Sequence, residues 1–150
     1  MSPVKPIQVL IVDDSLLFRQ TLFTQLEKDP YIKVVGTAVD SYDALNKINA
    51  LAPDVVTLDV EMPKMNGIDF LKTLLPKHAV PVVVVSSLPI NALDALDAGA
   101  VDYVSKPTIN SPSALNGFIG ELSTKIKIAS MAKVKRSLFN SSQSMPKLCN

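Results

Sequence analysis

A chain of 150 residues has the length of one domain and can bury roughly 68–70% of the surface that its unfolded form exposes. With 47% hydrophobic and 19% charged residues it is not a disordered chain, and its apolar runs are too short to cross a bilayer. The net charge of +1 combines an acidic part over residues 1–120, with nine Lys/Arg and thirteen Asp/Glu, and a basic tail over 121–150, with six and one. We therefore expect the two parts to have different roles.

The two ends of the chain bear on its location. The first residues, Met1 to Pro6, do not have the charged start and apolar stretch of a secretion signal. Cys149 is the only cysteine, which excludes an internal disulfide and a thiolate metal cage. We expect a reducing, cytoplasmic setting without membrane insertion.

Apolar runs of strand length alternate with stretches of helical spacing. The strand runs are Ile7–Val12, Val34–Ala38, Val55–Leu58, Pro81–Val85 and Tyr103–Val104. The helical stretches place apolar residues at Phe18, Leu22, Leu26, then Ala44, Leu45, Ile48, Leu51, then Ile68, Leu71, Leu75. This βαβα alternation predicts a doubly wound α/β fold, with five parallel strands and helices on both faces of the sheet.

The fifth helix is predicted to start near Ser111 and Pro112, a cap followed by a proline at the first helical position. Its inner face is predicted to hold Leu115, Phe118, Ile119, Leu122 and Ile126. From about Lys127 onward the pattern decays into basic and serine-rich sequence. We therefore predict one domain over residues 1–128, and a helix end and linker over 129–150.

Five polar residues stand at the carboxyl ends of the predicted strands. Asp13 and Asp14 follow the first strand, Asp59 ends the third, Ser86 ends the fourth, and Lys106 follows the fifth. Ligands of an open parallel sheet bind at this edge, so we expect the five side chains to converge. Crowded carboxylates repel one another, and a hard cation such as Mg²⁺, which prefers oxygen ligands, relieves the repulsion.

The same residues suit phosphoryl chemistry. With Lys106 and the metal neutralising charge, the carboxylate of Asp59 can attack phosphorus and form an acyl phosphate. The hydroxyl of Ser86 can then donate to a phosphoryl oxygen. Asp13 and Asp14 alone would more often be a solvated turn, and Ser15 beside them a helix cap, so the prediction rests on the whole set.

Three segments carry a resemblance to a known family. Residues 9–15 (VLIVDDS), 58–67 (LDVEMPKMNG) and 103–107 (YVSKP) resemble those of two-component response regulators. More narrowly, residues 59–63, 86–88 (SSL) and 99–107 (GAVDYVSKP) are similar to the receiver domain of the chemotaxis protein-glutamate methylesterase. The resemblance covers about residues 6–128 and implies a flavodoxin-like sheet of order 2-1-3-4-5.

The resemblance also implies roles for individual residues. Asp14 and Asp59 would bind the metal directly, Asp13 largely through metal-bound water, and Glu61 through its backbone carbonyl. The side chain of Glu61 is expected to be an exposed loop residue, or to affect hydrolysis of the acyl phosphate.

Switching and phosphate supply are implied in the same way. The phosphoryl group would come from a histidine kinase. Ser86 and Tyr103 would shift together on phosphorylation, and the Lys106–Pro107 peptide bond would be cis. The segment from Pro89 to Ala98 is short for the family's fourth helix and leaves about two turns.

The family's catalytic domain is not in this sequence. There is no Gly-x-Ser-x-Gly elbow and His78 is the only histidine, so the chain cannot assemble a Ser-His-Asp hydrolase. We expect a module that controls an attached protein-glutamate methylesterase, a hydrolase that acts on chemoreceptors. By itself the chain would only gain and lose its own phosphoryl group.

Two other functions stay open on the sequence. One is a stand-alone response regulator that acts by binding a partner. The other is a phosphatase of the haloacid dehalogenase type, which also uses Asp, Lys and Mg²⁺ but has no counterpart of Asp13 and Asp14. We expect no nucleic-acid partner, because the basic run from Lys125 to Arg136 lacks interleaved aromatic residues.

Overall fold

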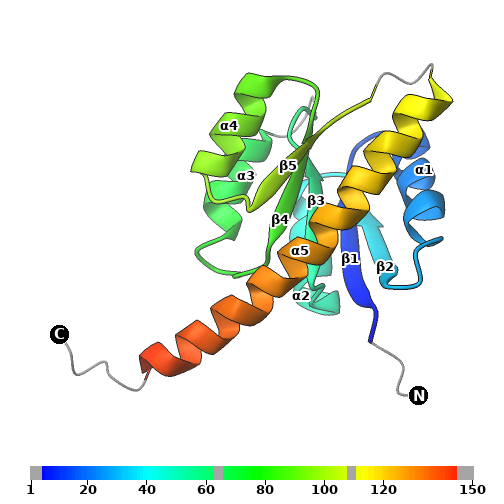
Figure 1. Ribbon diagram of the computed structural model, residues 1–150. Coiled ribbons are helices and arrows are strands. Elements are labelled where there is room, and N and C mark those ends of the chain that lie inside the picture. Colours follow the sequence, from blue (N-terminus) through cyan, green and yellow to red (C-terminus); the bar gives the residue numbers. More distant parts are fainter. Residues whose placement is uncertain (1–4, 63–65, 108–110, 145–150) are drawn as a thin grey trace.

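The computed structural model describes residues 5–62, 66–107 and 111–144, with 133–144 described by their backbone alone. Strands and helices alternate along the chain as the sequence predicts (Figure 1). The elements are β1 (Ile7–Val12), α1 (Leu16–Leu26), β2 (Ile32–Ala38), α2 (Ser41–Leu51), β3 (Val55–Asp59), α3 (Gly67–Leu74), β4 (Val82–Ser86), α4 (Pro89–Asp97), β5 (Asp102–Ser105) and α5 (Pro112–Ser144). Helix α4 has the two-turn length expected of it.

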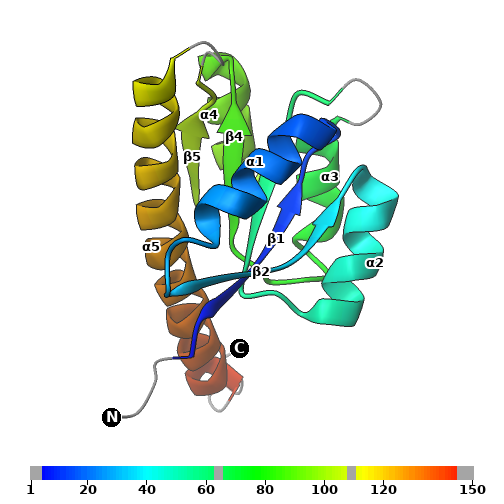
Figure 2. The same ribbon diagram turned by 90° about the vertical axis from the view of Figure 1, so that its right-hand side faces the viewer.

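The strands form one parallel sheet of order β2-β1-β3-β4-β5. Helices α1 and α5 cover one face of this sheet, and α2, α3 and α4 cover the other (Figures 1 and 2). This is the flavodoxin-like fold predicted from the sequence. All carboxyl ends of the strands therefore meet at one edge of the sheet.

Successive residues of β1 supply two separate cores. Val9 and Ile11 pack with the α1 and α5 side, which includes Phe18. Leu10 and Val12 pack with the α2 to α4 side. Because a strand turns alternate side chains to opposite faces, the part of a central strand that is covered on both faces must be apolar, which explains the run Val9–Val12.

Polar caps fix the helix starts next to the functional edge. The Ser15 hydroxyl accepts from the amide of Phe18 at 3.2 Å, so its role as the cap of α1 is confirmed. Asn66 caps α3 in the same way. At Gly67 a Cβ would lie 2.6 Å from the Cα of Val60, so only glycine lets α3 begin this close to the end of β3.

Helix α5 packs as predicted and ends at Ser144. Phe118, Leu122 and Ile126 are buried. The helix continues to Ser144, past the point near Lys127 where the apolar pattern decays. The sequence from 121 to 144 contains no glycine or proline to interrupt the helix. Beyond the sheet, α5 projects away from the domain (Figure 1). The assignment of 129–150 to an interdomain linker stays a prediction.

Candidate functional site

Three carboxylates gather at the ends of β1 and β3. Val12 pairs with Leu58, so the residues that follow and end these strands are neighbours. One carboxylate oxygen from each of Asp13, Asp14 and Asp59 lies within 4.8 Å of the others. Asp13 and Asp59 are 1% and 3% exposed, whereas Asp14 is exposed. The structure therefore brings the predicted acidic cluster together, with one member open to solvent.

Lys106 supplies positive charge to this cluster from the end of β5. Its Nζ lies 3.0 Å from Oδ2 of Asp59 and 3.6 Å from Oδ2 of Asp13. The ammonium also lies 4.4 Å from the centroid of the Phe18 ring, a cation–π contact that positions it from α1. Burial by itself lowers the pKa of Lys106, but the charges of Asp13 and Asp59 outweigh it, so the net pKa is raised.

The backbone around Lys106 corrects one expectation. No peptide bond in the described residues is cis, so the expected cis Lys106–Pro107 bond is wrong. The lysine reaches Asp59 without it. The amide of Lys106 donates to the carbonyl oxygen of Ser86 at 2.9 Å, which sets the start of this loop against the end of β4.

Asp13 shows that the cluster lacks positive charge. Burial, followed by the charge of Asp59, raises the pKa of Asp13 from 3.8 to about 6. The amide of Ser15, which donates to Oδ1 at 2.8 Å, offsets this in part, as does Lys106. One lysine among three carboxylates leaves an excess of negative charge on oxygen ligands alone. This donor set fits a hard divalent cation such as Mg²⁺.

Sequence reasoning missed the role of the Glu61 side chain. Its carboxylate accepts from the Ser86 hydroxyl at 2.6 Å, the amides of Ser87 and Leu88 at 2.8 and 3.0 Å, and the Asn91 side chain at 3.0 Å. Burial by itself raises the pKa of Glu61, but these hydrogen bonds, led by that from Ser86, outweigh it and hold the pKa at about 2. Glu61 therefore ties the β3–α3 loop to the start of α4.

The two predicted switch residues lie on neighbouring strands. Ser86 is 3% exposed at the end of β4, and Tyr103 is partly buried on β5 against the α2 to α4 core. The Nζ of Lys125 donates to the Tyr103 carbonyl at 2.6 Å and lies 5.2 Å from the centroid of its ring. Tyr103 is thus held by α5, a contact that the sequence did not indicate.

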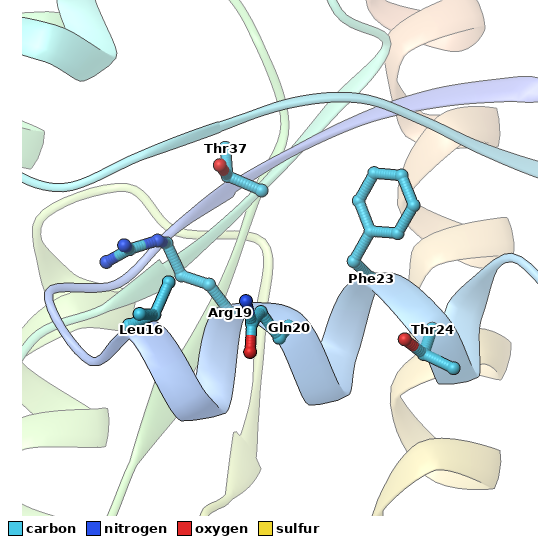
Figure 3. Close-up of a pocket in the computed structure, with 6 residues that line it drawn as sticks. All are labelled: Leu16, Arg19, Gln20, Phe23, Thr24 and Thr37. Atoms are coloured by element: carbon cyan, nitrogen blue, oxygen red, sulfur yellow. The ribbon is translucent and has the colours of Figure 1, made fainter.

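A groove of about 500 Å³ lies beside the cluster, between α1 and β2 (Figure 3). Its lining residues are Leu16, Arg19, Gln20, Phe23, Thr24 and Thr37. None of the predicted site residues lines it. Arg19 links it to the cluster by donating to the backbone carbonyl of Asp13 at 2.7 Å. The groove is therefore a neighbouring surface and not the site of the carboxylate chemistry.

The comparison with known families decides the class of protein. The model of the response regulator receiver domain matches residues 9–115. The chain belongs to this family. The predicted resemblance is thereby confirmed, and the chain groups with receiver domains instead of haloacid dehalogenase phosphatases. Receiver domains bind Mg²⁺ at an acidic pocket, and the aspartate cluster is such a pocket.

Relatives place the domain near chemotaxis regulators. It is 52% identical over 133 residues to a protein-glutamate methylesterase/protein-glutamine glutaminase 2 of Syntrophomonas wolfei, covering 89% of this chain and 39% of that protein. The chain thus spans about two fifths of this relative's length. The response regulator domain of Thermotoga maritima CheB is 40% identical with a TM-score of 0.75, covering 84% of this chain and 97% of that one.

A second solved structure is a complex. CheY6 from R. sphaeroides, solved with the P1 domain of CheA3, gives a match that is 30% identical with a TM-score of 0.70 and covers 86% of this chain and 99% of the matched chain. The receiver domain is therefore homologous to both methylesterase receivers and chemotaxis regulators of the CheY type. None of the helices in the described part of the chain combines the length and the apolarity that a membrane span needs.

Proposed function

We propose that this receiver domain accepts a phosphoryl group on Asp59 and thereby regulates an attached protein-glutamate methylesterase. The observation that carries the proposal is the position of Asp59. Its buried carboxylate lies among two further aspartates and 3.0 Å from the ammonium of Lys106. A nucleophilic oxygen, a fixed cation and a cation-binding set of oxygens therefore stand within one small space.

In the proposed reaction, an oxygen of Asp59 forms a bond to phosphorus as the bond from phosphorus to a histidine nitrogen of the kinase breaks. The leaving histidine nitrogen takes up a proton from solvent, and the ionised carboxylate of Asp59 becomes an acyl phosphate. Lys106 balances charge on the phosphoryl oxygens, and the Ser86 hydroxyl donates to one of them. Tyr103 then shifts together with Ser86.

The metal set is part of this proposal. Asp13, Asp14, Asp59 and the backbone carbonyl of Glu61 would hold Mg²⁺, which supplies positive charge to the phosphoryl oxygens when bound. Asp14 is the exposed member and so the accessible point of entry for the cation. The carboxylates of Asp13 and Asp59 each already accept a backbone amide hydrogen bond that fixes their orientation.

The proposed partners are a chemotaxis histidine kinase and, through the methylesterase, chemoreceptors, all on the cytoplasmic side. The CheY6 match supports the kinase, because that relative was solved with the P1 domain of CheA3. At the start of α1, next to Asp14, the side chains of Leu16 and Leu17 are 60% and 64% exposed. These leucines offer an apolar surface to a kinase domain that presents its phosphohistidine to Asp59.

Incubation with acetyl phosphate and Mg²⁺ tests the acceptor. The intact mass should rise by one phosphoryl group in the wild type and in Asp94→Asn, an exposed control on α4. Asp59→Asn should stay unmodified, and hydroxylamine should remove the label, because it attacks acyl phosphates and not phosphoserine. Equal modification of Asp59→Asn would refute the assignment.

A further inference from the structure

The start of α4 has no cap of its own. Its N-cap residue is Leu88, whose side chain makes no capping hydrogen bond. The amides of Ser87 and Leu88 and the side-chain amide of Asn91 instead donate to Glu61, at 2.8, 3.0 and 3.0 Å. The acceptor that these three groups share therefore comes from the β3–α3 loop, 26 residues or more away in sequence. The amide of Leu88 also lies 3.1 Å from Oγ of Ser86.

The same carboxylate also takes the hydroxyl of Ser86, with Oγ 2.6 Å from Oε2 of Glu61. A hydroxyl carries one proton, so it donates fully to one acceptor at a time. The carbonyl oxygen of Leu88, 2.8 Å from Oγ, is a second acceptor within reach, and the shorter bond to the ionised carboxylate is the stronger use of that proton. In the proposed phosphorylated state the Ser86 hydroxyl instead donates its hydrogen bond to a phosphoryl oxygen on Asp59. The two uses exclude each other.

Glu61 is also joined to the acceptor residue itself. Its amide donates to Oδ1 of Asp59 at 2.8 Å, while its side chain binds Ser86. A phosphoryl group on Asp59 thus brings further negative charge close to the carboxylate of Glu61. That carboxylate already binds the Ser86 hydroxyl, which the phosphoryl group would also bind. Repulsion between the two anions and loss of the Ser86 proton act in the same direction.

We propose that the Glu61 carboxylate is an internal competitor of the phosphoryl group for the Ser86 hydroxyl, and that it holds the start of α4 until phosphorylation displaces it. This inference rests on the proposed acceptor role of Asp59. Glu61 acts through Ser86 and is therefore a positioning residue. When it is displaced, the amide of Ser87 loses its acceptor and the amide of Leu88 keeps only the 3.1 Å bond to Oγ of Ser86. The exposed apolar start of α4, with Leu88 and Ile90 52% and 62% exposed, is then released.

Beryllofluoride, a stable mimic of the phosphoryl group, provides the test on the whole chain with Mg²⁺ present. The half-saturating beryllofluoride concentration, measured from amide chemical shifts, should fall about tenfold in Glu61→Ala relative to wild type, equivalent to about 1.4 kcal/mol. Glu61→Gln, which keeps an acceptor without the charge, should give a smaller fall. The same pair of measurements in a Ser86→Ala background should show no change, because no hydroxyl remains to compete for.

The outcomes separate this inference from the proposed function. An unchanged half-saturating concentration in Glu61→Ala would overturn the competition. So would a fall of the same size when Glu61→Ala is made in the Ser86→Ala background, because removal of the negative charge would then explain the effect without the hydroxyl. Wild type that binds no beryllofluoride would overturn the proposed function and the competition together.

Hydrogen exchange tests the hold on α4 directly. In wild type without metal or beryllofluoride, the amides of Ser87 and Leu88 should be protected. The amide of Ser87 should exchange at least about tenfold faster in Glu61→Ala and in beryllofluoride-bound wild type, and that of Leu88, which keeps Oγ of Ser86 as an acceptor, should speed up less. The buried amide of Val84 in β4 stays protected and serves as the internal control. Equal protection of Ser87 and Leu88 in all three samples would overturn the proposed hold.

Discussion

Asp13→Asn should stabilise the metal-free domain, because the native carboxylate is ionised at a cost. Its pKa rises from 3.8 to about 6 on folding, mainly through burial. A difference of about 2.2 units at 1.36 kcal/mol each gives an upper bound of about 3 kcal/mol against folding at pH 7. Asparagine removes the charge and keeps an oxygen that can accept from Ser15, but it loses the ion pair with Lys106. We therefore expect a net gain of about 1–2 kcal/mol.

The sign of the pH dependence follows from the same shift. Between about pH 4 and 6 the folded state holds a proton on Asp13 that the unfolded state does not, so wild-type stability rises as the pH falls through 6. The advantage of Asp13→Asn should therefore shrink from pH 7.5 to pH 5. The pKa of Glu61 is lowered from 4.5 to about 2, so its contribution to the stability of the fold is lost only below about pH 4.5. Glu61 therefore does not disturb the comparison between pH 7.5 and pH 5.

Urea denaturation measures the effect in two conditions. In EDTA at pH 7 the variant should be more stable than wild type. In Mg²⁺ at a hundredfold excess over the dissociation constant, wild type should gain about 2.7 kcal/mol and the variant much less, so the order should reverse or the gap close. A variant that is less stable than wild type in EDTA, or a difference that does not change with pH, would refute the argument that Asp13 carries uncompensated charge.

Further changes test the fold and the site together. Gly117→Ala and Gly120→Ala should each raise the free energy of unfolding by up to about 1 kcal/mol, because an added Cβ meets no atom within 4 Å; urea denaturation measures the gain. Gly67→Ala should instead lower it by about 1–3 kcal/mol, since its Cβ would lie 2.6 Å from the Cα of Val60. Lys106→Met should slow phosphorylation by acetyl phosphate by about a hundredfold, followed by intact mass over time, while the domain stays folded by circular dichroism.

The sequence pattern of a single segment was enough to predict its structure where that segment alone determines it. The apolar run Val9–Val12 predicted a buried parallel strand, because both faces of such a strand are covered. Ser15 was expected to be a helix cap from its position after the aspartates, and it caps α1. The sequence placed the end of α5 only within residues 129–150, because loss of apolar periodicity ends burial and not the helix itself. Residues 121–144 hold no glycine or proline, and the helix continues to Ser144.

Contacts between distant segments set the limit of sequence reasoning. The polar residues at the strand ends were predicted to converge because the sheet topology alone brings them to one edge. The position of the Glu61 side chain depends on how far the β3–α3 loop leans toward α4, which no periodicity or motif records. The hold of Lys125 on Tyr103 likewise depends on the packing of α5 against β5, across 22 residues of sequence.

Asp13 and Glu61 show how one small region assigns opposite tasks to two carboxylates. Asp13 is nearly fully buried, accepts one backbone amide hydrogen bond and shares a single lysine with Asp59. Its negative charge is therefore only partly compensated, and its pKa is raised. Glu61 accepts hydrogen bonds from four protein donors at the start of α4. These bonds stabilise its negative charge, and its pKa is lowered. A bound cation stabilises Asp13 most, because that carboxylate has few hydrogen-bond donors. The Ser86 hydroxyl is held at Glu61, where several donors converge. The supply of N–H and O–H donors, more than the acids themselves, therefore separates the metal-binding side of this site from the side that restrains α4.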